Sequence, residues 1–350
     1  MLRLAARAAS ALALASALAL TATTPALADP PGPVPTDIVG VGAGVTETLL
    51  NRFSTDYNAS LAAAGDTTSP RLYSWDATGT TQITTKIGAN PITRPNGTGL
   101  GIQALNTYTS GTVDFVRTGR VPQVGDPTTN MYVAMARDAV SWAAPTGGNA
   151  PANLTSRNLI DIYTCTVTNW RQIDPALPDA TIRAVLPTFG GDIRQTFLRA
   201  LGQGAPIATG ACVEPIEREN QGTDAILHDP NAIVPYSVGH YVGQVYGGHT
   251  RPGDEPGALV PRSVDGIPAV DTVNHTINPA LISTTFIYNL YNAVRGTDWS
   301  SSDAHAAALR TIFGRNGWIC RSDGGVPLIR EYGFLTIPTL ACGSTMHAPS

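Results

Sequence analysis

A strand, a glycine-rich turn and a helix follow one another three times in this 350-residue sequence. In the first copy, 37–53 (DIVGVGAGVTETLLNRF), an apolar run enters a turn with three alternating glycines, and a helical pattern leaves it. The other copies are 94–105 (RPNGTGLGIQAL) and 183–201 (RAVLPTFGGDIRQTFLRAL). Such turns leave backbone N–H groups at a helix start, where the helix dipole adds partial positive charge. The repeat therefore predicts one binding cleft built from several loops.

The rest of the chain continues to alternate strands with helices, which favours an α/β fold with parallel sheets. Two apolar runs, 131–142 and 285–294, fit segments that cross from one lobe into a second lobe and back. Roughly 320 residues remain beyond the N-terminal leader, a length typical of two lobes. The expected lobes are 29–130 together with 286–350, and 131–285.

Local signals also predict where two helices begin. The run 154–163 is expected to be a helix capped by Thr155 or Ser156. The alanine-rich run 301–313 is expected to be a helix that is capped by Ser301 or Ser302 and ends before Gly314.

The first 28 residues predict a signal peptide. Arg3 and Arg7 form a basic head, 8–24 is an Ala/Leu-rich apolar run, and Ala26-Leu27-Ala28 matches a small-x-small cleavage site. An uncleaved membrane anchor is the alternative interpretation. The next residue is Asp29 rather than the lipid-attachment cysteine of an exported lipoprotein. We therefore expect cleavage near Ala28 and a secreted, extracytoplasmic product with no membrane insertion.

Charge and motif content narrow the function classes. Without Arg3 and Arg7 the chain has 20 basic residues (22 − 2) against 26 acidic ones, which argues against nucleic acid and anionic membranes as partners. The six histidines show no metal-binding spacing, and no G-x-S-x-G nucleophile motif is present. We therefore expect a monomer that uses neither a metal nor a cofactor.

Four cysteines in an exported chain predict two disulfides, and three pairings are formally open. The most economical pairing joins Cys165 to Cys212 and Cys320 to Cys342, because each bridge then stays within one region. The separations are 212 − 165 = 47 and 342 − 320 = 22 residues. A zinc site is the competing interpretation, but none of the cysteine spacings matches the C-x2–4-C of such sites.

Several motifs together resemble a known family. VGAGVTET, RPNGTGLGIQAL, VDFVRTGR, LIDIYTCTVTNW and FGGDIRQTFLRALG occur in the order found in the phosphate-binding components of bacterial ABC importers, and the sequence is most similar to an actinobacterial secreted branch. The resemblance implies a type 2 periplasmic-binding-protein fold, an α/β fold of two lobes joined by two crossing strands. It also implies a small-molecule ligand such as phosphate or another oxyanion, and an ABC transporter permease as partner.

The resemblance further implies which residues hold the ligand. Thr46, Thr98 and Thr118 keep hydroxyls in the first loop, the second loop and the VDFVRTGR turn. Gly119 stands where the family tends to have Asp, and Pro187 lies near the place of an upstream arginine, for which Arg183 and Arg194 are candidate substitutes. The candidate ligand-binding set is Thr46, Glu47, Arg94, Asn96, Gly97, Thr98, Arg117, Thr118, Gly191, Asp192 and Arg194.

The third loop departs most from the family. Where the family has Gly-Ser-Gly-Thr, this chain has Gly190-Gly191-Asp192-Ile193, without either hydroxyl. With Gln195, Asp192 forms a D-x-x-Q variant of a capping box, and its carboxylate would repel a phosphate at the same helix start. Glu47 occupies a similar position in the first helix, and for both acids a helix-capping role competes with a ligand role. The added negative charge predicts that tight phosphate binding is weakened or lost.

Three arginines argue in the opposite direction. Arg94, Arg117 and Arg120 flank candidate ligand turns, and arginine recognises phosphate, sulfate or carboxylate in bidentate fashion. The alternative is that they form pairs inside one lobe with Asp114, Asp76 or Glu47. Three hypotheses therefore remain open. They are an exported solute-binding protein for a small oxyanion, a secreted binding protein that kept the fold but lost tight phosphate binding, and, remotely, a phosphatase-type enzyme that uses Asp192 or Glu47.

Overall fold

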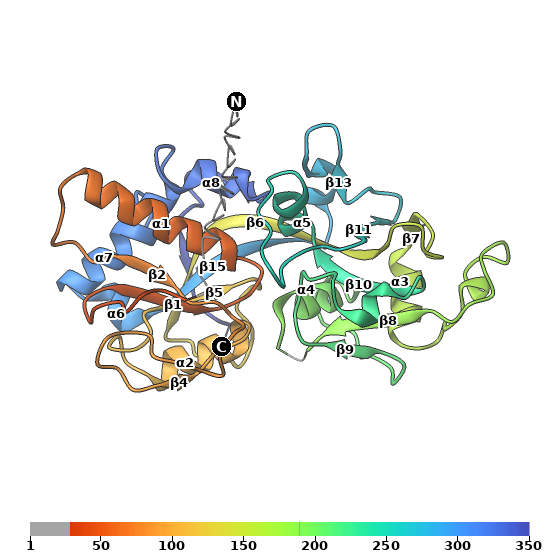
Figure 1. Cartoon of the computed structure of the whole chain (residues 1–350), viewed down its shortest axis with the longest axis horizontal. Coiled ribbons are helices and arrows are strands. Elements are labelled where there is room, and N and C mark those ends of the chain that lie inside the picture. Colours follow the sequence, from red (N-terminus) through yellow and green to blue (C-terminus); the bar gives the residue numbers. More distant parts are fainter. Residues whose placement is uncertain (1–28, 189, 350) are drawn as a thin grey trace, which may run out of the picture.

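The computed structural model describes residues 29–188 and 190–349, and it divides into two lobes that lie side by side (Figure 1). The expected signal peptide, 1–28, lies outside the described residues. We call the half that contains β1 (Ile38–Gly42) lobe 1 and the half that contains β8 (Arg183–Pro187) lobe 2. The chain has the two-lobed α/β fold that the sequence predicts.

Lobe 1 is built on a sheet whose central strands are buried along their whole length. β1 lies between β2 (Leu72–Ser74) and β5 (Phe115–Thr118), and both pairs are parallel. All five residues of β1 are buried, as expected for a strand covered on both faces. The helices of this lobe are α1 (Glu47–Ala63), α2 (Thr98–Thr107), α6 (Gly296–Ser300), α7 (Ala304–Phe313) and α8 (Gly325–Glu331).

Lobe 2 repeats the plan around β8. That strand lies between β10 (Ala232–Ser237) and β9 (Glu214–Ile216), again in parallel pairs. The helices of this lobe are α3 (Ser156–Tyr163), α4 (Asp192–Leu201) and α5 (Val238–Val245). Thr155 caps α3 in a reciprocal capping box with Asn158, which is the expected start of this helix.

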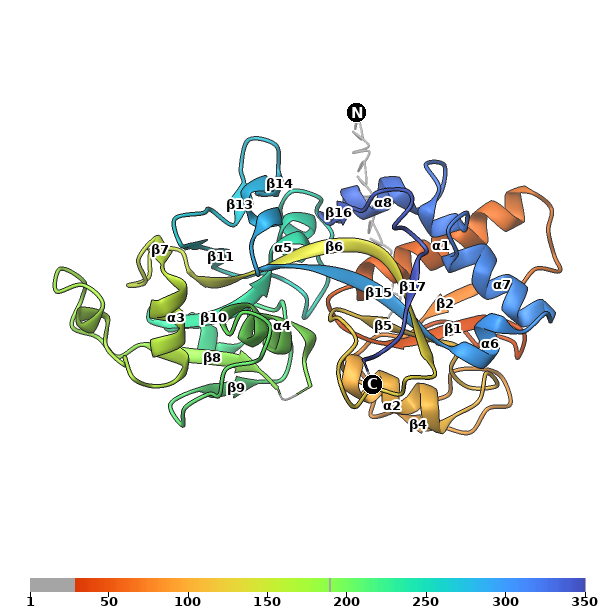
Figure 2. The same cartoon turned by 180° about the vertical axis from the view of Figure 1, so that it is seen from behind.

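Two long strands connect the lobes, as the apolar runs predict. β6 (Asn130–Pro145) and β15 (Ile287–Arg295) run antiparallel to each other from lobe to lobe (Figure 2). β15 also pairs antiparallel with β5, and β6 pairs antiparallel with β10. The expectation of parallel sheets is therefore correct inside each lobe and wrong for the crossing strands, which make the whole sheet mixed.

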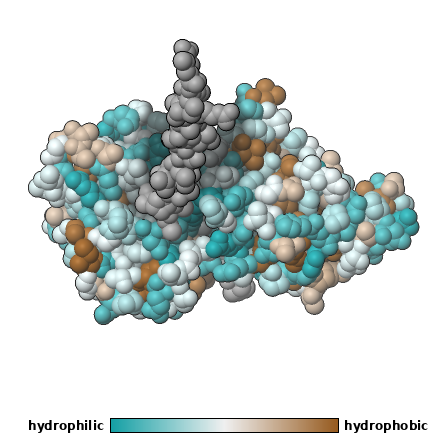
Figure 3. Space-filling model, viewed as in Figure 1, coloured by the Kyte–Doolittle hydropathy of each residue, from teal (hydrophilic) through white to brown (hydrophobic). Residues whose placement is uncertain are grey.

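The remaining elements are short. They are β3 (Gln82–Ile83), β4 (Ile92–Thr93), β7 (Asn153–Leu154), β11 (Leu259–Pro261), β12 (Ser263–Val264), β13 (Val270–Asp271), β14 (Thr276–Ile277), β16 (Leu335–Thr336), β17 (Thr345–Met346) and the 3-10 turns Trp170–Gln172, Ala225–His228, Pro279–Ser283 and Trp318–Cys320. None of the helices in the described ranges is both long enough and apolar enough to cross a membrane. Hydrophobic residues on the face seen in Figure 3 lie in separate spots among hydrophilic ones.

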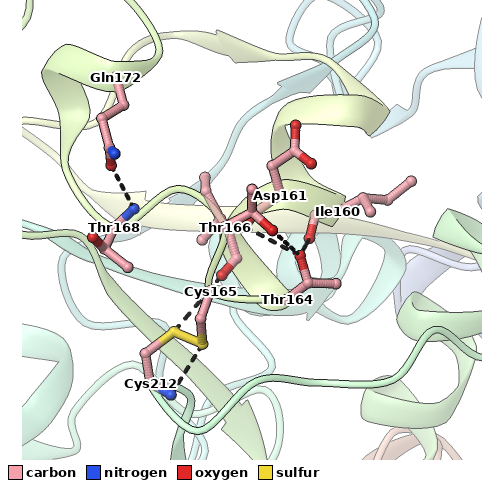
Figure 4. Close-up of a disulfide and its surroundings, with 9 residues drawn as sticks. Ile160, Asp161, Thr164, Cys165, Thr166, Thr168, Gln172 and Cys212 are labelled. Atoms are coloured by element: carbon pink, nitrogen blue, oxygen red, sulfur yellow. Dashed lines mark hydrogen bonds between the residues drawn. A yellow bond between two sulfur atoms is a disulfide. The ribbon is translucent and has the colours of Figure 1, made fainter.

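Two disulfides join Cys165 to Cys212 and Cys320 to Cys342, the pairs that the sequence favours. The first links the turn after α3 to the segment before β9 (Figure 4). The second ties the turn before α8 to the C-terminal segment. Each bridge thus closes a loop within one lobe.

Lobe 1 also contains a buried ionic cluster around the single lysine of the sequence. Lys86 Nζ lies 2.7 Å from Asp114 Oδ2, and both side chains are fully buried. Asp114 Oδ2 also accepts the Val39 amide at 2.7 Å, and its Oδ1 lies 2.7 Å from His305 Nε2. The cluster joins the loop after β3, the start of β5 and α7.

Candidate functional site

The three glycine turns of the sequence repeat meet where the lobes face each other. Gly97 precedes α2 in lobe 1 with φ +87°, and a Cβ atom there would lie 2.7 Å from the carbonyl oxygen of Gly190 in lobe 2. Glycine is therefore required at 97 for two reasons, its left-handed backbone and the close approach of the other lobe. The structure brings the starts of α1, α2 and α4 together at the interface between the lobes.

Glu219 of lobe 2 lies between two of these turns. Its Oε2 accepts the amide of Ile193, in the first turn of α4, at 2.9 Å. A Cβ atom at Gly191 would lie 3.3 Å from Oε2, and one at Gly44 of lobe 1 would lie 3.6 Å from Oε1. A side chain at Gly191 would crowd the carboxylate and one at Gly44 would be in van der Waals contact with it, so the carboxylate lies between the two turns.

Asp192 is the first residue of α4, and its side chain is fully buried against lobe 1. A Cβ atom at Gly119 would lie 3.0 Å from the Cβ of Asp192, so Asp192 fills the space that a side chain at 119 would need. The expected capping box with Gln195 is wrong. The N-cap is Gly191, and the Ile193 amide is taken by Glu219, which lies 26 residues away in the sequence.

Several buried polar atoms at this interface have no full hydrogen bond to any residue in 29–188 or 190–349. We call them the open polar atoms. They are Thr46 Oγ1, Thr98 Oγ1, Asp192 Oδ1 and Oδ2, and Glu219 Oε1. The Thr98 hydroxyl is near enough to Asp192 to lower the pKa of its carboxyl, although the contact does not meet hydrogen-bond geometry. Thr118 differs, because its hydroxyl donates to the Arg120 carbonyl at 2.7 Å.

The two carboxyl groups titrate abnormally. Burial raises the pKa of Asp192 to about 6, an effect that the Thr98 hydroxyl and the Arg120 charge only partly offset. Burial, followed by the charge of Asp192, raises the pKa of Glu219 to about 8. Arg120 is itself engaged in a bidentate pair with Asp126 at 2.8 Å. The pair therefore tends to hold one proton near neutral pH.

Two of the three arginines expected near the ligand turns bond to partners within lobe 1, and Arg117 Nη2 also lies 3.9 Å from Glu47 Oε2. Arg117 is fully buried and donates to the carbonyls of Ala43 at 2.9 Å and Trp75 at 2.7 Å. Arg94 donates to the Thr80 carbonyl at 2.7 Å and forms a bidentate pair with Asp29 at 2.7 and 2.8 Å. These bonds hold the loops that shape the cleft.

The two arginines considered as substitutes for the family's upstream arginine also have partners within lobe 2. Arg194 donates to the Pro187 carbonyl at 3.1 Å. Arg183 pairs with Glu214 at 2.7 Å on the outer part of lobe 2. These bonds do not place either guanidinium group beside the open polar atoms.

Glu47 takes part in a contact between the lobes. It begins α1, and its carboxylate accepts the Ala77 amide and forms an ion pair with Arg251 of the 247–257 loop in lobe 2. Arg251 Nη1 also lies 2.6 Å from Asp76 Oδ2 in lobe 1. The side chains of Glu47 and Asp76 are each only 6% exposed, so this pairing is shielded from solvent.

His240 on α5 forms a second contact between the lobes. Its Nδ1 lies 3.1 Å from the Val45 carbonyl oxygen of lobe 1, and its Nε2 lies 2.7 Å from Asp254 Oδ1. A carbonyl oxygen can only accept, and an ionised carboxylate likewise, so both ring nitrogens must carry protons to make both bonds. Burial lowers the pKa of His240, but the charge of Asp254 and the two bonds outweigh it and raise the pKa overall.

A cavity of about 210 Å³ opens beside Glu219 at the lobe interface. Lobe 1 contributes Gly44, Asn96 and the loop 76–79, and lobe 2 contributes Arg218, Glu219 and the loop 251–254. Arg218 donates to the Gly253 carbonyl at 3.3 Å. Within the described chain, no group of three or more His, Cys, Asp and Glu side chains is arranged to hold a metal ion.

Three residues at the cleft were not among the sequence candidates, namely Glu219, His240 and Arg251. All come from lobe 2 segments that lack a glycine turn followed by a long helix. One signal pointed to Glu219, because ENQGTDAIL (219–227) has the composition of a loop followed by a helix start. The partners of Arg251 and His240 lie in the other lobe, so local patterns did not single them out.

Comparisons with known proteins relate the chain to other proteins by family and by fold. A family model described as a PBP superfamily domain matches residues 49–319. A search of curated proteins finds no match. Among the solved structures that are similar in fold, three illustrate the likeness, which at 12–15% identity concerns the fold alone.

One is a candidate phosphate ABC transporter substrate-binding protein with bound phosphate from Clostridium perfringens, with a TM-score of 0.60 and 13% identity, covering 86% of this chain and 100% of that chain. Another is an ABC-type phosphate transport receptor from Vibrio cholerae, with a TM-score of 0.56 and 15% identity over the same shares of the two chains. The third is a phosphate-binding protein from Stenotrophomonas maltophilia, with a TM-score of 0.54 and 12% identity, covering 87% of this chain and 91% of that chain.

Proposed function

Because the chain belongs to the PBP superfamily, we propose that it is an exported solute-binding protein whose lobes close over a small polar ligand. Its role is binding rather than catalysis. Residues 1–28 act as the signal peptide, and 29–130 with 286–350 and 131–285 move as the two lobes. The partners are the ligand and an ABC transporter permease, and the mature protein is a monomer outside the cytoplasm.

One observation carries this proposal. The open polar atoms of Thr46 and Thr98 from lobe 1 and of Asp192 from lobe 2 are buried where the lobes meet. A buried polar group without a hydrogen bond costs about 1–3 kcal/mol, so a closed and empty cleft is unfavourable. A small ligand that supplies both donors and acceptors removes this cost, and binding then shifts the lobes towards the closed state.

The chemistry of these atoms restricts the ligand. The threonine hydroxyls can donate or accept, whereas ionised carboxylates only accept. Sulfate has no proton to donate at neutral pH, but the phosphate monoanion carries hydroxyl groups. Among oxyanions, a protonated phosphate-like species therefore suits the site best, and neutral hydroxylated molecules suit it as well.

The earlier candidate residues divide into two groups under this proposal. Thr46, Thr98 and Asp192 face the ligand, with Asn96, Gly97 and Gly191 shaping the turns around it. The residues that hold these loops in place are Glu47, Arg94, Arg117, Thr118 and Arg194.

A second candidate function is a secreted binding protein that kept the fold but lost tight phosphate binding. The position of Glu219 favours it, because the carboxylate already accepts the α4 amide that an anion would use. The ligand is then a polar molecule without a fully ionised oxyanion group.

Thermal-shift and calorimetric titrations of the mature protein test the proposal. The panel contains phosphate, sulfate, neutral sugars and amino acids. A ligand at about 100 times its Kd should stabilise the protein by about 2.7 kcal/mol. Small-angle scattering with and without that ligand should show a smaller radius of gyration on closure. If no member of the panel shifts the melting temperature or the radius, the proposal is wrong for small solutes.

A further inference from the structure

We infer that Glu219 is a specificity-determining residue whose carboxylate takes the place of a bound oxyanion between the glycine turns of the two lobes. The closed cleft therefore rejects fully ionised oxyanions and admits groups that bring hydrogen-bond donors. This inference rests on the proposed function, because it concerns the ligand of the same cleft.

The contacts of the carboxylate are those expected of a bound anion. Oε2 accepts the Ile193 amide at the start of α4, a ten-residue helix whose dipole favours negative charge there. Oε1 lies beside Gly44, in the turn that precedes α1 of the opposite lobe. A free oxyanion would need to displace Glu219 to reach the same amide.

Asp192 provides independent evidence for the chemistry of the ligand. Its side chain is fully buried, and neither of its oxygens meets full hydrogen-bond geometry within the described chain, although the Thr98 hydroxyl and the amides of Thr98 and Gly119 lie near enough to lower its pKa. Glu219 is close enough that the charge of Asp192 raises the Glu219 pKa. The pair carries one negative charge near neutral pH and two above about pH 8, so it repels a dianion and attracts hydroxyl, amide or ammonium donors.

The nearby cations do not cancel this preference. Arg120 forms its bidentate pair with Asp126, and His240 bonds to Asp254 and the Val45 carbonyl. Arg251 is paired with the two acids of lobe 1. Each cation therefore has its own carboxylate partner, and the Asp192–Glu219 pair has no direct salt bridge within residues 29–188 and 190–349.

The cavity beside Glu219 indicates where the donor-bearing group lies. Its volume is about 210 Å³, and Glu219, Asn96 and Arg218 are among its lining residues. A ligand in this cavity can donate to Glu219 Oε1 while it interacts with polar groups of both lobes. The class of ligand is thus a small hydroxylated or ammonium-bearing molecule.

Phosphate titrations of three variants at about pH 9, where phosphate is dianionic, test the inference. E219Q keeps the shape of the side chain and removes its charge, and E219A removes both charge and bulk. E217Q is the matched control, because Glu217 is exposed and only two residues away. We expect E219A to bind phosphate at least about tenfold more tightly than wild type, E219Q to show a smaller gain, and E217Q to match wild type.

Equal phosphate affinity in wild type, E219Q and E219A would overturn the inference, as would wild-type binding of sulfate as tight as that of the preferred ligand. Should E219A fail to fold, E219Q alone decides, because it is nearly isosteric. The result of these variant titrations is separate from the result of the ligand panel that tests the proposed function. A gain of phosphate binding in E219A supports the role of Glu219 even if wild type binds nothing in the ligand panel.

Discussion

Arg251 Nη1 of lobe 2 lies 2.6 Å from Asp76 Oδ2 of lobe 1, and the same guanidinium pairs with Glu47 at the start of α1. The loop that carries Arg251 also lines the inter-lobe cavity. Arg251 therefore connects the contact between the lobes directly to the loops that line the inter-lobe cavity. The carboxylates of Glu47 and Asp76, which pair with Arg251, are both shielded from water.

Substitution R251Q should favour the open state. The variant removes charge-assisted hydrogen bonds, each worth about 1.5–3 kcal/mol, from contacts made only when the lobes are closed. We expect a larger radius of gyration by small-angle scattering and weaker ligand binding. The control is R171Q, because Arg171 forms an exposed pair with Asp179 inside lobe 2. An unchanged radius of gyration in R251Q would show that the ion pairs of Arg251 do not stabilise the closed state.

The stability of the protein should fall as pH rises from about 5 to about 9. Asp192 and Glu219 have pKa values raised to about 6 and about 8 in the folded protein, so the folded state holds protons that the unfolded state releases. Stability decreases with pH wherever the folded state binds more protons. Asp76 adds to the trend, because burial raises its pKa to about 7.

The variant D192N/E219Q should flatten this profile, with the residual slope reflecting Asp76 and His240, whose pKa values are also raised in the folded protein. The measurement is the urea midpoint at several pH values between 5 and 9, and E217Q serves as the control with the wild-type slope. The same slope in the double variant and wild type would contradict the assignment of the protons to this pair.

Loss of the buried lysine should destabilise lobe 1 strongly. K86M leaves the Asp114 carboxylate buried with His305 and the Val39 amide as its partners, and breaking a buried pair costs about 3–5 kcal/mol. R321Q breaks an exposed pair with Asp323 and should change stability by no more than about 1 kcal/mol. Urea unfolding of both variants checks the contrast. Equal midpoints for the two would show that the cluster contributes little.

Removal of either disulfide should lower stability, with a somewhat larger effect for the longer loop. Chain entropy gives about 4 kcal/mol for the 47-residue separation of Cys165 and Cys212 and about 3 kcal/mol for the 22-residue separation of Cys320 and Cys342. Paired serine variants of each bridge, compared by urea unfolding, test this order. The prediction is wrong if C165S/C212S is as stable as the intact protein.

The sequence was most informative where structure depends on neighbours along the chain. The three glycine turns lie directly before α1, α2 and α4. They could be predicted because the backbone requirements of such turns are local. Local patterns were less reliable for caps, since α7 is capped by Asp303 rather than by Ser301 or Ser302. Asp303 offers a carboxylate to the Ala306 amide at 2.8 Å, and Ser301 instead bonds to Asp303.

The composition of the cleft could not be predicted in the same way. The VDFVRTGR motif places Arg117 beside a candidate ligand turn, but it does not indicate that the guanidinium bonds to carbonyls 42 and 74 residues away. Asp192 looked like a cap because the pattern D-x-x-Q is local, whereas the actual partner of the helix start, Glu219, comes from another loop. Pairings between distant segments depend on the packing of whole lobes, which a local pattern does not contain.

The position of β15 has a consequence for how the chain acquires its structure. This strand lies between β5 and β6 in the sheet of lobe 1, yet it follows every strand of lobe 2 along the chain. The bond from Arg137 to Asn289 spans 152 residues. During synthesis the parallel strands β8, β9 and β10 of lobe 2 are all present by residue 237, whereas β15 in the sheet of lobe 1 is complete only at residue 295. Because such long-range pairing is slow, lobe 1 should be the last part to mature and the part most exposed to misfolding.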